Sequence, residues 1–98
     1  MPSTLYVTAS FVVKSEGLTE MLDLLAELTL HTRQEPGCLD YGYFQSLENP
    51  LQLTSFEVWQ SAEAEALHWQ AEHLAAALSR AAGLLQDTPR ISKYRRVC

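Results

Sequence analysis

Residues 38–59 read CLDYGYFQSLENPLQLTSFEVW, and this stretch decides the fold. Two runs rich in aromatic and β-branched residues, 38–47 and 51–59, flank Glu48-Asn49-Pro50, a sequence typical of a turn. The stretch therefore predicts a β-hairpin. Helix-like sequence lies on both sides of it, so the hairpin is expected to form the middle of a mixed α and β domain.

The segment before the hairpin predicts one strand and one helix. Residues 4–14 are rich in β-branched and aromatic side chains, and both parities are rather apolar, so the strand is expected to be covered on both faces. From Leu18 to about Gln34, apolar residues recur at spacings of three and four, the period of an amphipathic helix. Glu35-Pro36-Gly37 is expected to end that helix.

The segment after the hairpin repeats this order in reverse. Ser61 is a suitable N-cap for a helix over residues 62–82, and Gly83 follows the end of that alanine- and leucine-rich run. Pro89 precedes a last short strand over residues 91–97. The order βαββαβ predicts an α+β, ferredoxin-like fold in one domain spanning residues 1–98, with a four-stranded antiparallel sheet and two helices on one face.

Composition excludes several classes of function. The chain has 98 residues, 47% of them hydrophobic, and a net charge of −5, which argues against disorder and against a nucleic-acid partner. No apolar run is long enough for a bilayer, and no targeting segment is visible, so we expect no membrane partner. Two cysteines without metal-ligand spacing are expected to be free thiols in a reducing cytoplasm.

The charges are unevenly distributed along the chain. Residues 1–89 hold all 12 acids but only three bases, a net charge of −9. The remaining four bases lie in the last strand and tail: Arg90, Lys93, Arg95 and Arg96. On a strand at a sheet edge or dimer seam, such side chains discourage unwanted strand pairing and meet acidic groups. We therefore predict that the basic tail complements the acidic body of the protein.

The open face of the sheet predicts a partner. A domain of this size alone buries only about 60–65% of its unfolded surface. Because the predicted strands carry apolar side chains on both faces, the face without helices is expected to pack against another apolar surface. We therefore expect a homodimer formed through the sheets. Tyr41 and Tyr43 share a face and are expected to fill that interface. Glu57 lies among apolar neighbours and is expected to pair with a base of the last strand or of the partner chain.

The sequence lacks the motifs of common cofactor and metal sites. It contains no glycine-rich phosphate loop, no dinucleotide fingerprint and no motif of a nucleophilic hydrolase. His68 and His73 lie five residues apart, about 140° around a continuous helix, so they would not share a face as a metal-binding pair does. We therefore expect no metal and no tightly held cofactor.

Three parts of the sequence resemble one family. The stretch EPGCLDY at 35–41, FEVW at 56–59, and His68 followed by His73 resemble the antibiotic biosynthesis monooxygenase (ABM) domain, in particular its small quinol monooxygenase-type members. The resemblance covers nearly the whole chain. It implies that the sheets of two protomers join into a dimeric α/β barrel, with a pocket between sheet and helices. It further implies cofactor-free oxygenation of phenolic or quinol substrates.

The sequence also departs from some branches of that family. The haem-degrading members carry an asparagine, a tryptophan and a histidine where this chain has Ser10, His68 and Leu78, so the resemblance disfavours haem degradation. Members often break the second helical region with a proline just before the second histidine. This chain has Ala71-Glu72 there, which leaves open whether its second helix is broken.

An oxygenase of this kind needs an apolar pocket, a base and hydrogen-bond donors, because a phenol or hydroquinone reacts with oxygen as its anion. Histidine suits the base, since its ordinary pKa lies near 6.5. We predict His68 as the first catalytic candidate and His73 as the second. We predict Ser10, Tyr43 and Trp59 as substrate-binding residues, with Trp59 or Tyr43 forming an aromatic wall or donor.

Two classes of function remain open from sequence. The first is a cofactor-independent monooxygenase, and the second is a non-catalytic dimeric binding protein for a small apolar ligand. Several candidate residues also have structural interpretations. A histidine on an alanine- and leucine-rich helix can simply pack or cap, and Trp59 can belong to the core. Trp69 is expected at a rim, and Arg33 at a helix end.

Overall fold

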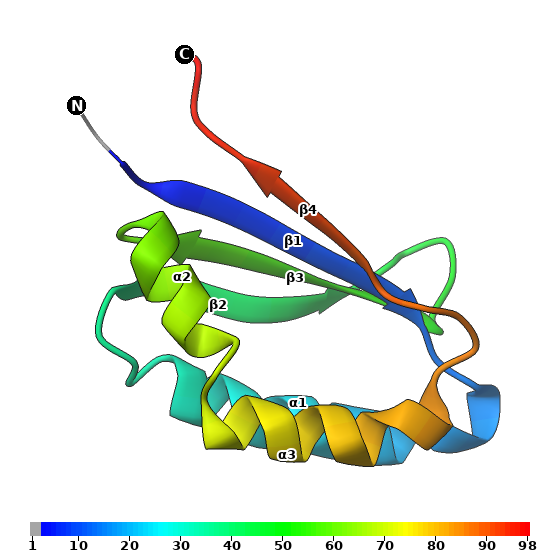
Figure 1. Cartoon of the computed structure of the whole chain (residues 1–98). Coiled ribbons are helices and arrows are strands. Elements are labelled where there is room, and N and C mark those ends of the chain that lie inside the picture. Colours follow the sequence, from blue (N-terminus) through cyan, green and yellow to red (C-terminus); the bar gives the residue numbers. More distant parts are fainter. Residues whose placement is uncertain (1–2) are drawn as a thin grey trace.

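The helices lie on one face of a four-stranded antiparallel sheet with strand order β2-β3-β1-β4 (Figure 1). The structure is a computed structural model and describes residues 3–98. Two short 3₁₀ helices, Ser15–Gly17 and Ala82–Leu84, accompany the following main elements: β1 Leu5–Val12, α1 Leu18–Thr32, β2 Cys38–Gln45, β3 Gln52–Trp59, α2 Ala62–His68, α3 Glu72–Ala81 and β4 Arg90–Tyr94. The predicted ferredoxin-like α+β fold is confirmed.

The second predicted helix is in fact two helices. The chain leaves helical geometry at Ala71, whose φ and ψ are −71° and 141°, and α3 starts at the next residue. The backbone N–H groups of Gln70 and Ala71 close the turn by donating to the carbonyls of Leu67 and His68. A continuous helix over residues 62–82 was therefore the wrong prediction. This break changes the direction in which the two histidines project.

The core has two parts. The larger part lies where α1 and α3 pack against each other and against the sheet, and it consists of Val13, Met21, Leu24, Leu25, Leu28, Leu53, Leu74, Ala77 and Ala81. The smaller part lies under α2 and consists of Val7, Tyr41, Trp59 and Ala64. Because α2 covers only the smaller part, the aromatic residues there form the floor of the region that holds the histidines.

Gly37 fixes the turn that connects α1 to β2. Its φ is +86°, a region that side chains rarely adopt, and a Cβ added there would lie 2.6 Å from the Cβ of Ala64. The turn thus lets α2 approach the start of β2 closely. It also positions Glu35, two residues earlier.

Replacing Gly37 by alanine is expected to lower the free energy of unfolding by about 2–3 kcal/mol, because strain and a close contact act together. Denaturant unfolding followed by far-UV circular dichroism measures the change. Gly83→Ala is the matched control, since a Cβ at Gly83 meets nothing within 4 Å. Equal stability of the two variants would contradict this account of the turn.

The structure corrects the placement of two tyrosines. Tyr41 and Tyr43 lie opposite Glu57 and Ser55 in the β2–β3 ladder, on the face that the helices cover. The prediction that they fill a sheet-to-sheet interface is therefore wrong. Period-two alternation shows that they share a face, but it does not show which face the helices cover.

The opposite face of the sheet is open and carries exposed aromatic side chains. Phe44 and Phe56 are more than half exposed there, with ring centroids 5.2 Å apart, and Tyr94 of β4 is also exposed. The predicted position of the last strand at the sheet edge is confirmed. Two bases of this strand and of the tail after it act within the chain: Lys93 Nζ lies 3.0 Å from Glu65 Oε1, and the Arg96 guanidinium lies over the Tyr6 ring.

Within residues 3–98, no helix combines the length and the apolar character that crossing a membrane requires.

Candidate functional site

A cavity of about 270 Å³ lies between the sheet and the helices. All four strands and both helices after the hairpin contribute to its walls. The lining residues are Val7, Ala9, Phe11, Tyr41, Tyr43, Glu57, His68, Trp69, Leu74, Leu78, Pro89 and Ile91. Most of them are apolar, so the polar atoms of the tyrosines, Glu57 and His68 are the groups that can orient a ligand.

Glu35 connects the two histidines that the sequence singled out. Its Oε2 atom accepts from His68 Nδ1 at 2.8 Å and from His73 Nε2 at 2.5 Å. His68 is the last residue of α2 and His73 the second residue of α3, so the break between these helices lets both rings face one carboxylate. The sequence-based prediction that the two histidines do not share a face assumed one continuous helix. Because the helix is broken, that prediction is wrong.

His68 is held rigidly at the cavity wall. The residue is 3% exposed, and its ring centroid lies 4.9 Å from that of Trp59 and 5.5 Å from that of Tyr41. Because Glu35 accepts a hydrogen bond from Nδ1, a neutral His68 carries its proton there and a lone pair on Nε2. Among the described residues, Nε2 has no hydrogen-bond partner. That nitrogen is therefore available to a ligand.

Two tyrosines supply neutral hydroxyl groups at the same cavity. The Tyr41 and Tyr43 oxygens lie 2.8 Å apart, so one hydroxyl donates to the other. Burial raises the pKa of Tyr41 well above its ordinary value and that of Tyr43 to about 12. Both phenols therefore remain protonated at neutral pH. The second hydroxyl of the pair keeps its proton for a ligand atom.

Glu57 is a buried carboxylate whose partners are neutral. Its oxygens accept from Ser55 Oγ at 2.6 Å and from Trp59 Nε1 at 3.0 Å. The predicted ion pair with a base of the last strand is wrong, because Lys93 reaches Glu65 instead, and the alternative pairing with a base of the partner chain stays a prediction. Two side-chain donors of the same strand offset the cost of burying Glu57.

The remaining predicted residues lie at different depths. Tyr43 lines the cavity, whereas Trp59 is fully buried and lies behind His68 and Glu57. Ser10 projects from the opposite face of the sheet, where its hydroxyl lies 3.0 Å from Thr54 Oγ1, so the structure does not bring it near the histidines. Trp69 lies at the rim, 43% exposed, as expected.

Sequence reasoning missed three groups at the site. From sequence alone, Glu35 is expected to end a helix, Tyr41 to fill the dimer interface, and Glu57 to have an ionic partner. The Ser55-Phe56-Glu57-Val58-Trp59 spacing did contain a signal, because residues two apart on a strand share a face. For Glu35 no local signal existed, since its partners are more than 30 residues away in sequence.

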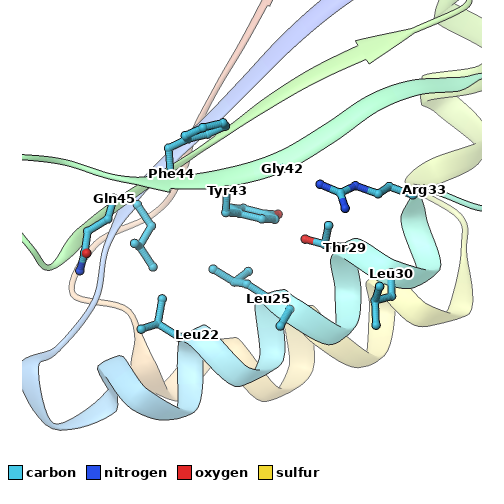
Figure 2. Close-up of a pocket in the computed structure, with 11 residues that line it drawn as sticks. Leu22, Leu25, Thr29, Leu30, Arg33, Gly42, Tyr43, Phe44 and Gln45 are labelled. Atoms are coloured by element: carbon cyan, nitrogen blue, oxygen red, sulfur yellow. The ribbon is translucent and has the colours of Figure 1, made fainter.

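A second, larger hollow of about 530 Å³ lies between α1 and β2 (Figure 2). Among the described residues, its lining includes one charged side chain, Arg33, and no histidine or carboxylate. Arg33 Nε donates to the carbonyl of Tyr41 at 2.9 Å, so the residue joins the end of α1 to β2. This groove lacks a base, which leaves the smaller cavity as the candidate site.

Cys38 is not a nucleophile at neutral pH. Burial, followed by the nearby charges of Glu35, Glu57 and Asp40, raises the pKa of its thiol to about 11. Iodoacetamide at about pH 8 is expected to modify the exposed Cys98 about 100-fold faster than Cys38, because the thiolate is the reactive form. Peptide mass mapping over time measures both rates, and comparable rates in the folded protein would contradict the assignment.

The fold and the cavity define a class: small ferredoxin-like α+β domains with a pocket between sheet and helices. The sequence model of one family, antibiotic biosynthesis monooxygenase, matches residues 4–80. The chain belongs to this family, which confirms the resemblance seen in the EPGCLDY and FEVW motifs.

Solved structures agree with this assignment. A conserved protein from Methanosarcina mazei Go1 is 31% identical, with a TM-score of 0.94 over 98% of this chain and 95% of that one. An antibiotic biosynthesis monooxygenase is 28% identical, with a TM-score of 0.92 over 96% of this chain and 99% of that one. Rv0793 from Mycobacterium tuberculosis, 23% identical, has a TM-score of 0.92 over 98% of this chain and 97% of that one, and shows the same fold.

No protein of curated function matches the sequence. Family membership, together with the 28% identical monooxygenase, supports a monooxygenase activity at the level of the family.

Proposed function

We propose that this protein is a cofactor-independent monooxygenase that oxidises a small phenol or quinol in the cavity beside His68. One observation carries the proposal: an apolar cavity is bordered by a histidine whose Nδ1 donates to a carboxylate, Glu35, that is only 12% exposed at its side chain. A volume of about 270 Å³ lies just below the usual range of ligand pockets and suits a substrate of one or two rings. We place the protein in the cytoplasm, because its two thiols are unpaired.

The first step is removal of a proton from the substrate. Nε2 of His68 accepts the phenolic proton, and Glu35 stabilises the resulting imidazolium through Nδ1. The Tyr41–Tyr43 pair donates a hydrogen bond to the substrate oxygen that becomes negative. The apolar walls exclude water, so these few polar groups act on the anion with little competition.

Oxygen then reacts with the anion at an unsubstituted ring carbon. The substrate supplies all the electrons: a C–O bond forms, the O–O bond breaks, one oxygen atom stays on the ring and the other leaves as water. The ring carbon loses its proton, and the product is a quinone. One phenol and one O₂ thus give one quinone and one water, with no external reductant.

His73 has a positioning role in this proposal. Its Nε2 donates to the same Glu35 oxygen that accepts from His68, on the more exposed side of the carboxylate. His73 thereby fixes the orientation of Glu35, and Glu35 fixes the ring of His68. We do not assign Ser10 to the site, because it lies on the other face of the sheet.

Oxygen-electrode measurements with hydroquinones and naphthols test the proposal. In the presence of a metal chelator, we expect uptake of one O₂ per substrate and formation of the quinone. If the same compounds bind without any uptake above the buffer rate, the protein is the alternative, a non-catalytic binding protein for an apolar ligand. His68→Ala should remove the uptake, and equal uptake in that variant would contradict the assigned base.

We also propose that the open face of the sheet forms a homodimer. Phe44, Phe56 and Tyr94 would otherwise remain exposed to water on one continuous face. Sheet-to-sheet association buries them and completes the barrel that family membership implies.

Phe56→Asp is expected to dissociate this dimer, because a carboxylate would be buried in the apolar interface. Sedimentation of the wild type at micromolar concentration should give twice the 11.0 kDa chain mass, and the variant should give the chain mass. Leu47→Asp, at a fully exposed position in the turn before β3, is the control and should remain dimeric. A monomeric wild type would rule out this interface.

A further inference from the structure

We propose that Glu35, His68 and His73 form a binding site for a zinc-type divalent cation. The three residues come from separate parts of the fold: the turn after α1, the end of α2 and the start of α3. Each offers one ligand atom, and these atoms all lie within 4.8 Å of one another. The spacing of the histidines in the sequence argued against a metal, and only the fold brings the three donors together.

The ligand types select the kind of ion. Two imidazole nitrogens and one carboxylate form a ligand set that suits Zn²⁺, and also Co²⁺ and Ni²⁺, with a further position left for water. Mg²⁺ and Ca²⁺ prefer six or more oxygen ligands, whereas the cluster supplies oxygen only from Glu35. We therefore expect transition-metal ions to bind and the alkaline-earth ions not to compete.

The site needs an adjustment of its three side chains to accept an ion. Metal–ligand bonds of about 2.0–2.2 Å place tetrahedral ligand atoms about 3.3 Å apart. The Glu35 oxygen now lies 2.8 Å from His68 Nδ1 and 2.5 Å from His73 Nε2. Glu35 must therefore retract by less than about 1 Å, and the two ring nitrogens, which lie within 4.8 Å of each other, must come to the same spacing, through rotations of the three side chains. His73 is 26% exposed at its side chain, which gives the ion an entry path.

The break between α2 and α3 favours the same arrangement. Residues 69–71 are Trp-Gln-Ala and contain neither proline nor glycine, yet the helix ends there. The break brings both imidazoles to the same side, toward Glu35. His31, the third histidine of the chain, stacks against His73 with ring centroids 5.8 Å apart but is not one of the three donors.

Metal binding has a consequence that rests on the proposed function. An ion on Nδ1 of His68 moves the proton of the neutral ring to Nε2, the nitrogen that has to accept the substrate proton. The ion would therefore inhibit the oxygenase, and a chelator would restore its rate. Metal binding itself does not depend on the activity and is tested without it.

Cobalt titration of tag-free, chelator-treated protein tests the site. We expect visible absorption bands of four- or five-coordinate Co²⁺ that saturate at one equivalent, and displacement of the cobalt by Zn²⁺. His73→Ala should weaken binding at least about 100-fold, because it removes one of three ligands. His31→Ala is the matched control and should bind as the wild type does. Circular dichroism checks that both variants are folded.

The outcomes separate the two proposals. Absence of cobalt bands in the wild type, or equal binding by His73→Ala, would overturn the metal site and leave the oxygenase untouched. Saturable binding in a protein that consumes no oxygen would uphold the metal site and overturn the oxygenase. If Zn²⁺ binds and oxygen uptake is unaffected, the inhibitory consequence is wrong.

Discussion

His68→Asn is expected to lower the maximal rate of oxygen uptake by about 100- to 10,000-fold, the usual contribution of a positioned base. Asparagine suits the test because its amide N–H can still donate to Glu35, as Nδ1 of His68 does, whereas no lone pair replaces Nε2. The carboxylate therefore keeps a partner, and the fold is disturbed little. The loss should fall on kcat, with the KM for the phenol changing much less.

Two further variants make this result specific. Glu35→Gln should reduce kcat less than His68→Asn, by about 10- to 100-fold, because it loosens the orientation of the ring without removing the base. His31→Asn should leave kcat unchanged, since His31 is exposed and lies outside the cavity. A His68→Asn enzyme that keeps most of the wild-type rate would remove His68 from the mechanism.

Trp59→Ala is expected to lower the free energy of unfolding by about 3–5 kcal/mol, a large part of the stability of a domain of this size. Trp59 has no exposed surface, and its ring packs against His68 and Tyr41. Removing it leaves a cavity under α2 and takes one of the two described donors from the buried Glu57. Urea unfolding followed by far-UV circular dichroism, at equal protein concentrations, measures the loss.

The second tryptophan provides the matched control. Trp69 is 43% exposed at the cavity rim and donates from Nε1 to Glu65. Trp69→Ala should therefore cost about 1–2 kcal/mol, much less than Trp59→Ala, since it opens no internal void. Similar losses for the two variants would contradict the assignment of Trp59 to the core that supports the site.

The sequence predicts the elements of this fold well because their signals are local. Alternation in residues 38–59 and the period of residues 18–34 predict the hairpin and the first helix. The break at residues 69–71 was not predictable in this way, because it contains no proline or glycine and coincides with a contact to Glu35 from a distant part of the chain. The facing of Tyr41 and Tyr43 also depends on tertiary packing, since period two alone does not distinguish the two faces.

The candidate site was predicted in part for the same reason. His68 and His73 stand out because histidine is rare in this chain and suits proton transfer. Their shared partner, Glu35, lies in a motif that also ends a helix. That local role explains the residue in the sequence, so its hydrogen bonds to the two distant histidines were not predicted. Ser10 is an error of the opposite kind, because a residue predicted for the site lies outside it. Its neighbour Ala9 lines the cavity, and Ser10, the next residue of the strand, projects from the other face of the sheet.

Filling each hollow in turn tests most directly whether oxygenation takes place beside His68. Ala9 lines the cavity with His68, and Ala26 lines the larger groove between α1 and β2. The measurement is oxygen uptake with the best quinol or naphthol substrate by wild type, Ala9→Phe and Ala26→Phe, each checked for folding. We predict that Ala9→Phe loses nearly all uptake, whereas Ala26→Phe retains the wild-type rate. Full activity in Ala9→Phe, or its loss in Ala26→Phe alone, would contradict the account.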